Sequence, residues 1–241
     1  MKYRDLIYER YASLGSTSTR PLDAATKQRW VRALDFHFGK FLPERHDVRI
    51  LEVACGQGEF LRFLKEKGFT KLTGVDVSPE QVALARHACD DVHHEDVLTF
   101  LTRHDEAFDL VVGLDIIEHF QKDEAVSFLE LVHRALAPGG RLLMTTPNGS
   151  HLFSEPRYYD FTHEICFTPH SMTQLLSVCG FDVLAFGEGG PAPVGVTSTI
   201  RYGLWRGVVR PLIRGYNFVE LGHGGSGVYT RNFIVSAQKR Q

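Results

Sequence analysis

Residues 50–60, with the sequence ILEVACGQGEF, join an apolar run of strand type to two glycines separated by one residue. Gly56 and Gly58 follow a first buried strand, where the lack of a Cβ lets a ligand approach the backbone. Glu52 lies inside the apolar run, where burying its carboxylate costs on the order of several kcal/mol unless a cationic ligand group or backbone amides compensate. Asp76 ends the next predicted strand, where an acid can accept hydrogen bonds from both ribose hydroxyls. Their joint occurrence favours a ligand site at this turn.

Each of these residues also has a purely structural explanation. The glycines could form an ordinary tight turn, Glu52 could pair with a loop lysine, and Asp76 could be a turn residue. A dinucleotide-binding fold would have a third glycine at position 61, and this chain has Leu61 there. An oxidoreductase that uses NAD is therefore the less favoured alternative.

The elements that must position these residues alternate between strand and helix periods from about residue 47 to residue 186, which is typical of an α/β fold. The sequence predicts five strands, at residues 48–54, 71–77, 108–114, 141–147 and 181–187. Helices are predicted at 58–68, after Ser78, at 122–136 and at 171–180. We expect Ser78 to cap its helix with Gln81 as the capping-box partner and Pro79 at the first helical position. The segment APGG before residue 141 is predicted to be a turn.

An amphipathic helix is predicted before the first strand. Within residues 22–42, the apolar residues that share one helical face are Trp30, Leu34, Phe38, Phe41 and Leu42. We expect this helix to cover another part of the protein.

Composition bounds the class of protein. At 241 residues with 43% hydrophobic side chains, the chain can bury one sizeable core. The formal charge of -2 provides no field for a polyanion, so no nucleic-acid partner is expected. Four cysteines without a C-x-x-C pair indicate reduced thiols rather than disulfides or a zinc site. The charged N-terminal stretch lacks a signal-peptide core, and no segment approaches the roughly 20 apolar residues of a membrane span. These features predict a cytoplasmic location.

Five stretches carry a resemblance to a known family through their residues and their order: LEVACGQG, GVDVS, HHEDVL, FDLVVGLDIIEHF and LAPGGRLLMTTPN. Together they resemble the class I S-adenosylmethionine-dependent methyltransferases over roughly residues 47–190. Ala54 stands where the family's turn has its first glycine, and a methyl group is usually tolerated there. The resemblance implies a Rossmann-like, doubly wound sheet of seven mostly parallel strands, with RNFIVSAQK as the antiparallel last strand.

That resemblance also implies one domain over residues 1–241. Its expected parts are an N-terminal helical cap (1–46), a cofactor-binding core (47–190), a lid-like insertion (191–230) and the final strand (231–241).

The implied cofactor is S-adenosyl-L-methionine, with S-adenosyl-L-homocysteine as product. By resemblance, Glu52 lies near the ammonium group of the methionine portion, and the backbone at Gly56 and Gly58 contacts the same portion. Leu114 and Asp115 end the fourth strand of the pattern and are expected to line the methionine end as well.

The adenosine portion has its own implied contacts. Asp76 is expected to hold the ribose hydroxyls, with Val77 beside the adenine. Asp96 resembles the acid that accepts from the exocyclic amine of adenine, with Val97 on the ring face. His119 follows one helical turn after the fourth strand and is included among the cofactor contacts.

Methyl transfer to a hydroxyl requires a base, most often a histidine. His163 lies in the polar and aromatic segment 155–169 close to Asp160, and this D-x-T-H segment resembles those of bacterial methyltransferases that act on sugars of surface glycans. We predict His163 as the base, with His119 as its rival. The alternative is that His163 caps the following helix or orders the loop. No metal is expected, because no carboxylate pair with convincing spacing accompanies the histidine.

Residues 187–230 extend the family pattern. Trp205, Val209 and Ile213 recur at helical spacing, each followed by an arginine, and Pro211 must kink or interrupt the helix. One interpretation is a lid over the acceptor pocket. The other is a basic amphipathic face over residues 197–214 that contacts anionic lipid at the inner membrane surface, which would suit a lipid-linked acceptor.

The sequence therefore predicts a methyltransferase that methylates a sugar hydroxyl in surface polysaccharide biosynthesis. The alternative within the class is O- or N-methylation of a small aromatic, quinone-like or other secondary metabolite, because Phe153, Tyr158, Tyr159 and Phe161 can pack on a flat ring as well as on a sugar. Outside the class, the alternative is a catalytically silent subunit that binds the cofactor. The acceptor and the oligomeric state are not specified by the sequence.

Overall fold

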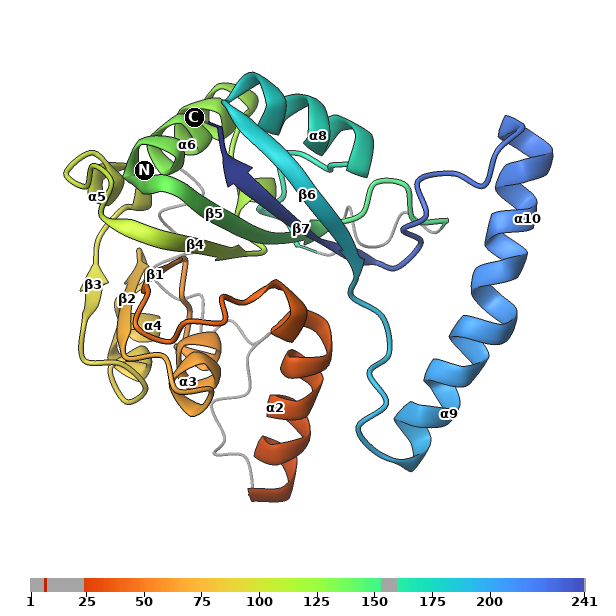
Figure 1. The fold of residues 1–241 in the computed structure, drawn as a ribbon, viewed down its shortest axis with the longest axis horizontal. Coiled ribbons are helices and arrows are strands. Elements are labelled where there is room, and N and C mark those ends of the chain that lie inside the picture. The colour runs from red at the N-terminus through yellow and green to blue at the C-terminus, as the bar shows by residue number, and fades with distance from the viewer. Residues whose placement is uncertain (1–6, 8–23, 153–159, 241) are drawn as a thin grey trace.

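The structure, a computed structural model, describes residue 7, residues 24–152 and residues 160–240 (Figure 1). Its centre is a seven-stranded sheet with the order β3-β2-β1-β4-β5-β7-β6. The strands are β1 (Arg49–Val53), β2 (Lys71–Asp76), β3 (Val92–His94), β4 (Phe108–Leu114), β5 (Leu136–Pro147), β6 (Phe181–Glu188) and β7 (Asn232–Lys239). The pairs from β3 through β5 are parallel, and β7 is antiparallel to both β5 and β6. The predicted fold class, including the antiparallel last strand, is confirmed.

Helices cover both faces of this sheet (Figure 1). They are α2 (Ala24–Phe38), α3 (Glu59–Glu66), α4 (Pro79–Ala85), α5 (Val97–Leu101), α6 (Lys122–Ala135), α8 (Pro169–Val178), α9 (Val196–Leu204) and α10 (Arg210–Leu221), with shorter turns η1 (Gly39–Phe41), η2 (Ile117–His119) and η3 (Trp205–Val209). Two apolar cores result, one containing α6 and α8 and the other α2, α3 and α4.

Strand alternation explains why there are two cores. Ile50 of β1 belongs to the core that contains α3, and its neighbour Leu51 belongs to the core that contains α6. Val111 and Val112 of β4 divide in the same way. Because successive side chains of a strand point to opposite faces, a strand buried on both faces must be apolar throughout. This is why β1 and β4 are mainly hydrophobic, with Glu52 as the buried charged exception in β1.

The predicted N-terminal helix is present as α2 and η1. Phe38 and Phe41 are buried, and Trp30, Leu34 and Leu42 pack against the same core. The helix therefore covers one face of the sheet beside α3, as its apolar face requires. Residues 1–23 of the expected N-terminal helical cap lie outside the described residues, apart from residue 7.

Two local predictions were wrong. Ser78 precedes α4 and Pro79 opens it as expected, but the Ser78 side chain makes no capping hydrogen bond. The segment APGG is not a turn before a strand, because β5 already begins at Leu136, which pairs with Phe108. Pairing then shifts and resumes at Arg141, so residues 137–140 form an irregularity inside the strand.

The C-terminal helices extend away from the sheet (Figure 1). None of the residues in α9, η3 and α10 is buried. The amide of Arg210 donates to the carbonyl of Trp205, five residues earlier, so η3 is a π-turn immediately before Pro211. Because the proline lacks an N–H and its ring clashes with the preceding turn of a regular α-helix, the wider turn lets the helix continue. The predicted interruption at Pro211 therefore takes the form of a π-turn.

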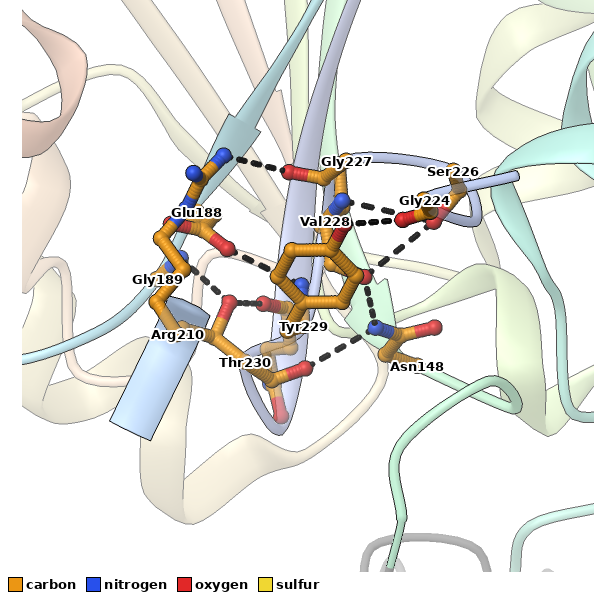
Figure 2. A network of polar contacts seen from close by, with 11 residues as sticks. Asn148, Glu188, Gly189, Arg210, Gly224, Ser226, Gly227, Val228, Tyr229 and Thr230 are labelled. Atoms are coloured by element: carbon orange, nitrogen blue, oxygen red, sulfur yellow. Dashed lines mark hydrogen bonds and ion pairs between the residues drawn. The ribbon is translucent and has the colours of Figure 1, made fainter. Parts of the chain in front are cut away.

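Arg210 attaches these helices to the end of the sheet (Figure 2). Its Nε lies 3.1 Å from Oε2 of Glu188 in β6, and its Nη2 donates to the carbonyl of Gly227 at 3.0 Å. The other carboxylate oxygen of Glu188 accepts from the amide of Tyr229 at 2.9 Å, and the guanidinium lies 5.3 Å from the centre of the Tyr229 ring. A second contact joins Tyr202 of α9 to Phe36 of α2, with ring centres 5.5 Å apart.

Candidate functional site

A cavity of about 520 Å³ lies at the carboxyl ends of the strands. Its lining includes Glu52 of β1, Leu114 of β4 and Asp115, and α2 closes one side with Trp30 and Phe38. The carboxyl ends of parallel strands are where ligands bind in doubly wound sheets. Among the described residues that line the cavity, none is lysine or arginine. Such a lining suits a ligand with positive charge and disfavours a pyrophosphate.

The glycine turn presents its backbone to the cavity at Gly56. This residue has φ +51, and a Cβ there would meet nothing within 4 Å. Gly58 has a different role, because a Cβ on it would lie 2.9 Å from Cα of Ala85 in α4. Gly58 therefore allows close packing of the turn on α4, and it is not among the residues that line the cavity. Ala54 lines the cavity and has φ 50, a left-handed conformation that costs a residue with a Cβ about 1 to 2 kcal/mol.

Three polar side chains around the turn each have a buried atom without a hydrogen-bond partner among the described residues. These atoms are Oε2 of Glu52, Nε2 of Gln57 and Oε1 of Gln81. All three residues line the cavity. Burial raises the pKa of Glu52 well above its usual value, opposed by a hydrogen bond from the amide of Leu61. Native proteins seldom leave buried polar atoms unpaired, because each costs about 1 to 3 kcal/mol. A bound polar ligand with a positive group would satisfy them.

Asp76 is held firmly at the end of β2. Its two carboxylate oxygens accept from the amides of Gly56 at 2.9 Å and Ser78 at 2.8 Å. Burial raises the pKa of Asp76, and these two hydrogen bonds act against that shift. Each carboxylate oxygen has a second lone pair, so the group can accept further hydrogen bonds from a ligand.

The residues predicted for the adenine lie beside this turn but outside the cavity lining. Val77 is 46% exposed. Asp96 caps α5, accepting from the amide of Thr99 at 2.9 Å, and Val97 is buried in the first turn of that helix.

Asp115 follows β4 and joins three strands at the far side of the cavity. Its Oδ1 accepts from the hydroxyl of Thr145 in β5 at 2.9 Å and from the side-chain Nδ2 of Asn232 in β7 at 3.0 Å. Burial raises its pKa, while these hydrogen bonds and the nearby His163 act in the opposite direction. Thr145 and Asn232 also line the cavity, and the sequence analysis missed both. Their roles depend on strand pairing far apart in the chain.

The predicted catalytic residues meet in one cluster. The hydroxyl of Thr162 lies 2.8 Å from Nδ1 of His119 and 2.7 Å from Oδ1 of Asp160. The rings of His119 and His163 are edge to face, with centres 4.9 Å apart. The structure therefore brings His119, predicted as the rival base, together with His163 and Asp160. Phe153, Tyr158 and Tyr159, the expected aromatic contacts of the acceptor, lie outside the described residues, and Phe161 is exposed.

Glu118 is the residue of this cluster that the sequence analysis missed. It is fully buried, and each of Glu118, His119 and His163 offers a possible metal-ligating atom within 4.8 Å of the others. The sequence analysis expected no metal because no carboxylate pair with convincing spacing accompanies the histidine, and the structure places one carboxylate, Glu118, beside two histidines. The acidic residue between Ile117 and His119, in an otherwise apolar stretch, was the available indication.

Comparisons with known proteins identify the family of the chain. A family model described as a methyltransferase domain matches residues 22–185. YqeM of Bacillus subtilis, a protein named as a methyltransferase, is 30% identical over 176 residues, which cover 67% of this chain and 65% of YqeM. A mitochondrial ubiquinone biosynthesis O-methyltransferase of Rattus norvegicus is 30% identical over 114 residues, covering 44% of this chain and 32% of that enzyme. A solved structure of a SAM-dependent methyltransferase from Archaeoglobus fulgidus has a TM-score of 0.61 at 22% identity, covering 99% of this chain and 100% of that one.

These comparisons differ in what they establish. The likeness to the solved structure shows the fold, and the chain spans 65% and 32% of the lengths of the two curated relatives. The family model extends from α2 into β6 and covers more than half of the chain. The chain belongs to the methyltransferase domain family.

Proposed function

We propose that the protein is an S-adenosylmethionine-dependent methyltransferase. The observation that carries this proposal is the buried Glu52 carboxylate, whose Oε2 lacks a partner among the described residues and faces a cavity at the strand ends. The cofactor supplies an ammonium and a sulfonium, the positive groups that such a lining requires. Gln57 and Gln81 offer a buried donor and a buried acceptor beside it.

The cofactor contacts follow the order of the strands. Glu52 and the backbone at Gly56 contact the methionine portion of the cofactor. Leu114 and Asp115 lie on the other side of that portion. Asp76 accepts from the ribose hydroxyls through its remaining lone pairs. The adenine extends over the surface at Val77, Asp96 and Val97. Ala54 lines the turn, and Gly58 supports it by packing on α4.

Methyl transfer is an in-line displacement in which the acceptor attacks the methyl carbon while the C–S bond breaks and its electron pair moves to sulfur. Alignment alone can supply about 7 to 11 kcal/mol in favourable intramolecular systems. A hydroxyl acceptor must also lose its proton, and the cluster of His119 and His163 adjoins Asp115 at the cavity. We assign the handling of this proton to that cluster, with Asp160 acting on His119 through Thr162.

We favour a sugar hydroxyl of a surface glycan as the acceptor, because the segment around His163 resembles those of glycan methyltransferases. A phenol of the quinone type is the second candidate, supported by the likeness to a ubiquinone biosynthesis O-methyltransferase. N-methylation of a metabolite amine is the third candidate.

Release of S-adenosylhomocysteine with nucleotide sugars, with glycans or with catechol-type phenols distinguishes these classes. A silent subunit would bind the cofactor and release no product with any acceptor.

The cofactor itself is tested by calorimetry. S-adenosylmethionine and S-adenosylhomocysteine should each bind the folded protein at one site per chain, and NAD should give no heat. The protein should also unfold at a higher temperature with S-adenosylmethionine than without it. Absence of heat with both sulfur compounds would overturn the proposal.

A second candidate property concerns α9, η3 and α10. Exposed apolar side chains occur at every fourth residue from Val196 to Tyr216, and further ones are exposed at Val209, Phe218, Val219 and Leu221. Four arginines and one glutamate accompany them, in a chain whose net charge is -2. We propose that this face contacts an anionic membrane surface over residues 197–214, so that the enzyme works at the cytoplasmic side on a lipid-linked acceptor. No helix among the described residues is both long enough and apolar enough to cross a membrane.

Sedimentation with phosphatidylglycerol vesicles tests this contact. Binding should be strong at low salt and should weaken as salt screens the arginines. Phosphatidylcholine vesicles provide the neutral control. A protein that remains in the supernatant with the anionic vesicles at low salt has no such membrane face.

A further inference from the structure

We propose that Glu118, His119 and His163 bind a divalent transition-metal ion on the acceptor side of the cavity. The role of this ion in the reaction rests on the proposed methyltransferase function. One ligand atom from each residue lies within 4.8 Å of the others. Glu118 belongs to η2, directly after β4, and His163 comes from the loop before α8. The fold thus brings a carboxylate and two imidazoles together from separate segments.

Unpaired buried atoms in the cluster point to a missing positive group. Oε1 of Glu118 and Nδ1 of His163 are both buried and lack a hydrogen-bond partner among the described residues. The second carboxylate oxygen of Glu118 accepts from the hydroxyl of Thr146 at 3.0 Å, which holds the side chain in place. A buried carboxylate with one unpaired oxygen is costly unless a cation compensates it. A metal ion bonded to Oε1 and Nδ1 would satisfy both atoms at once.

The hydrogen bonds of His119 prepare its ring for metal binding. The hydroxyl of Thr162 lies 2.7 Å from Oδ1 of Asp160, to which the amide of Thr162 also donates at 2.8 Å. A hydroxyl that donates to this carboxylate accepts from Nδ1–H of His119, 2.8 Å away. The proton is then on Nδ1, and the lone pair is on Nε2. Metal-binding histidines almost always have their second nitrogen held in this way by a neighbouring group.

The donor set selects the class of ion. Two imidazole nitrogens and one carboxylate oxygen suit Mn²⁺, Fe²⁺, Co²⁺ or Zn²⁺, whereas Mg²⁺ and Ca²⁺ prefer oxygen ligands. Ligands about 2.0 to 2.2 Å from such an ion lie about 3.0 to 3.5 Å from one another. Ligand atoms as far as 4.8 Å apart therefore need to approach by up to about 1.3 to 1.8 Å when the ion binds. Three protein ligands leave coordination positions open for an exogenous oxygen.

This ion would activate the acceptor hydroxyl. A metal-bound oxygen loses its proton far more readily, as the fall of the pKa of water from 15.7 to about 7 on zinc shows. The proton passes to water, the oxygen forms a bond to the methyl carbon, and the electrons of the C–S bond move to sulfur. The products are the methyl ether and the neutral thioether. In this scheme the histidines are ligands rather than free bases, and Thr162 and Asp160 are positioning residues.

Metal titration of the full chain tests the proposal. Protein treated with a chelator and then freed of it is titrated with Co²⁺, followed by calorimetry and visible absorption. We expect one ion per chain with the absorption of a nitrogen- and oxygen-ligated site. Glu118→Gln and His163→Ala should weaken Co²⁺ binding by more than about 100-fold, since even loss of a group that orients a ligand costs 10- to 100-fold. Thr162→Val should weaken it by about 10- to 100-fold.

Matched controls separate the site from adventitious binding. Glu66→Gln and His87→Ala change an exposed carboxylate and an exposed histidine outside the cluster and should leave Co²⁺ affinity unchanged. Circular dichroism establishes that each variant is folded, and His163→Ala changes a partly exposed side chain if Glu118→Gln fails to fold. Equal Co²⁺ binding by the wild type, the cluster variants and the controls would overturn the site. So would the absence of a stoichiometric ion.

Calorimetry with S-adenosylmethionine on the same metal-free protein separates this proposal from the proposed function. Metal-free protein that binds the cofactor but shows no Co²⁺ site would disprove the metal centre alone, and His163 would then be the free base. Protein that binds Co²⁺ at the cluster but neither S-adenosylmethionine nor its product would leave the metal site standing and remove the proposed reaction.

Discussion

The strand-end cavity and the C-terminal helices are incomplete in opposite ways. The cavity buries polar atoms without partners, at Glu52, Gln57 and Gln81. The helices expose apolar side chains, with Leu212 68% exposed and no buried residue in α9, η3 or α10. A polar ligand would supply partners for the unpaired atoms of the cavity. An apolar surface would cover the exposed side chains of the helices. The comparison indicates which class of molecule each region binds.

The two regions also differ in how they are held. The cavity lies on strands buried on both faces, so its carboxylates have little freedom to reach solvent. The C-terminal helices meet the rest of the chain at Arg210, which contacts Glu188, Gly227 and Tyr229 as Figure 2 shows, and at Tyr202, which contacts Phe36. We expect changes in the cavity to alter ligand affinity strongly, and changes on the helix surface to leave folding nearly unaffected.

The largest effect is expected at Glu52. Glu52→Gln keeps the size of the side chain and removes its charge, so affinity for S-adenosylmethionine should fall by about 1.5 to 3 kcal/mol, roughly 10- to 150-fold. Calorimetry on both proteins measures this difference. Glu59→Gln changes another carboxylate at the cavity that is less buried and should have a smaller effect. Equal affinity in the wild type and Glu52→Gln would place the ammonium elsewhere.

Glu52 also predicts a pH dependence of the ligand-free protein. Its pKa is raised well above 4.5 by burial. Between that usual value and the raised one, the folded state holds a proton that the unfolded state has lost, so the free energy of unfolding should decrease as pH rises through this window. Urea unfolding at several pH values should show this decrease, and Glu52→Gln should make it shallower. Asp76, whose pKa is also raised by burial, contributes in the same direction. A slope unchanged by the substitution would contradict the assignment.

Much of the fold followed from the sequence because its signals are local. The apolar runs of β1 and β4, the helical face of α2 and the opening of α4 at Pro79 each depend on spacing within a short segment. The failures were contacts that local patterns do not encode. The Ser78 side chain does not form its predicted capping hydrogen bond, and residues 137–140 form an irregularity inside β5 where it pairs with β4.

The residues of the candidate site also differ in whether a local sequence pattern reveals them. Glu52 was identified because a charged residue inside an otherwise apolar strand is unusual and can be seen in the sequence alone. Glu118 was missed because its role depends on contact with His163, which lies beyond β5 in the sequence. Thr145 and Asn232 were missed for the same reason: they bond Asp115 across the β4–β5–β7 order.

At the helix attachment, Arg210→Gln should lower the free energy of unfolding by about 1 to 3 kcal/mol. The substitution removes the ion pair with Glu188 and leaves that partly buried carboxylate with the amide of Tyr229. Urea denaturation measures the change, and proteolysis should cut the C-terminal helices faster. Arg206→Gln alters an exposed arginine of the preceding turn and serves as control. Identical behaviour of the two variants would show that Arg210 does not hold the helices.

A smaller effect, of opposite sign, is expected at Ala54. Its φ of 50 favours glycine, so Ala54→Gly should raise the free energy of unfolding by about 1 kcal/mol. Glu106 has φ 47 away from the cavity, and Glu106→Gly should give a similar gain. Denaturation of the two variants compares them directly. A loss of stability in Ala54→Gly alone would show that packing of its methyl group outweighs the backbone strain.

The smallest effect on folding is expected on the exposed helix face, at Leu212. Because this side chain is 68% exposed and glutamine is also a good helix former, Leu212→Gln should change the free energy of unfolding by no more than about 0.5 kcal/mol. The same substitution at Leu176, which is fully buried in α8, should cost at least about 2 kcal/mol. Leu212→Gln should nevertheless reduce sedimentation with phosphatidylglycerol vesicles, since the lost apolar area contributes to lipid binding and not to the core. If it lowers stability as much as Leu176→Gln does, the face is packed against another part of the protein in solution, and the contrast with the cavity disappears.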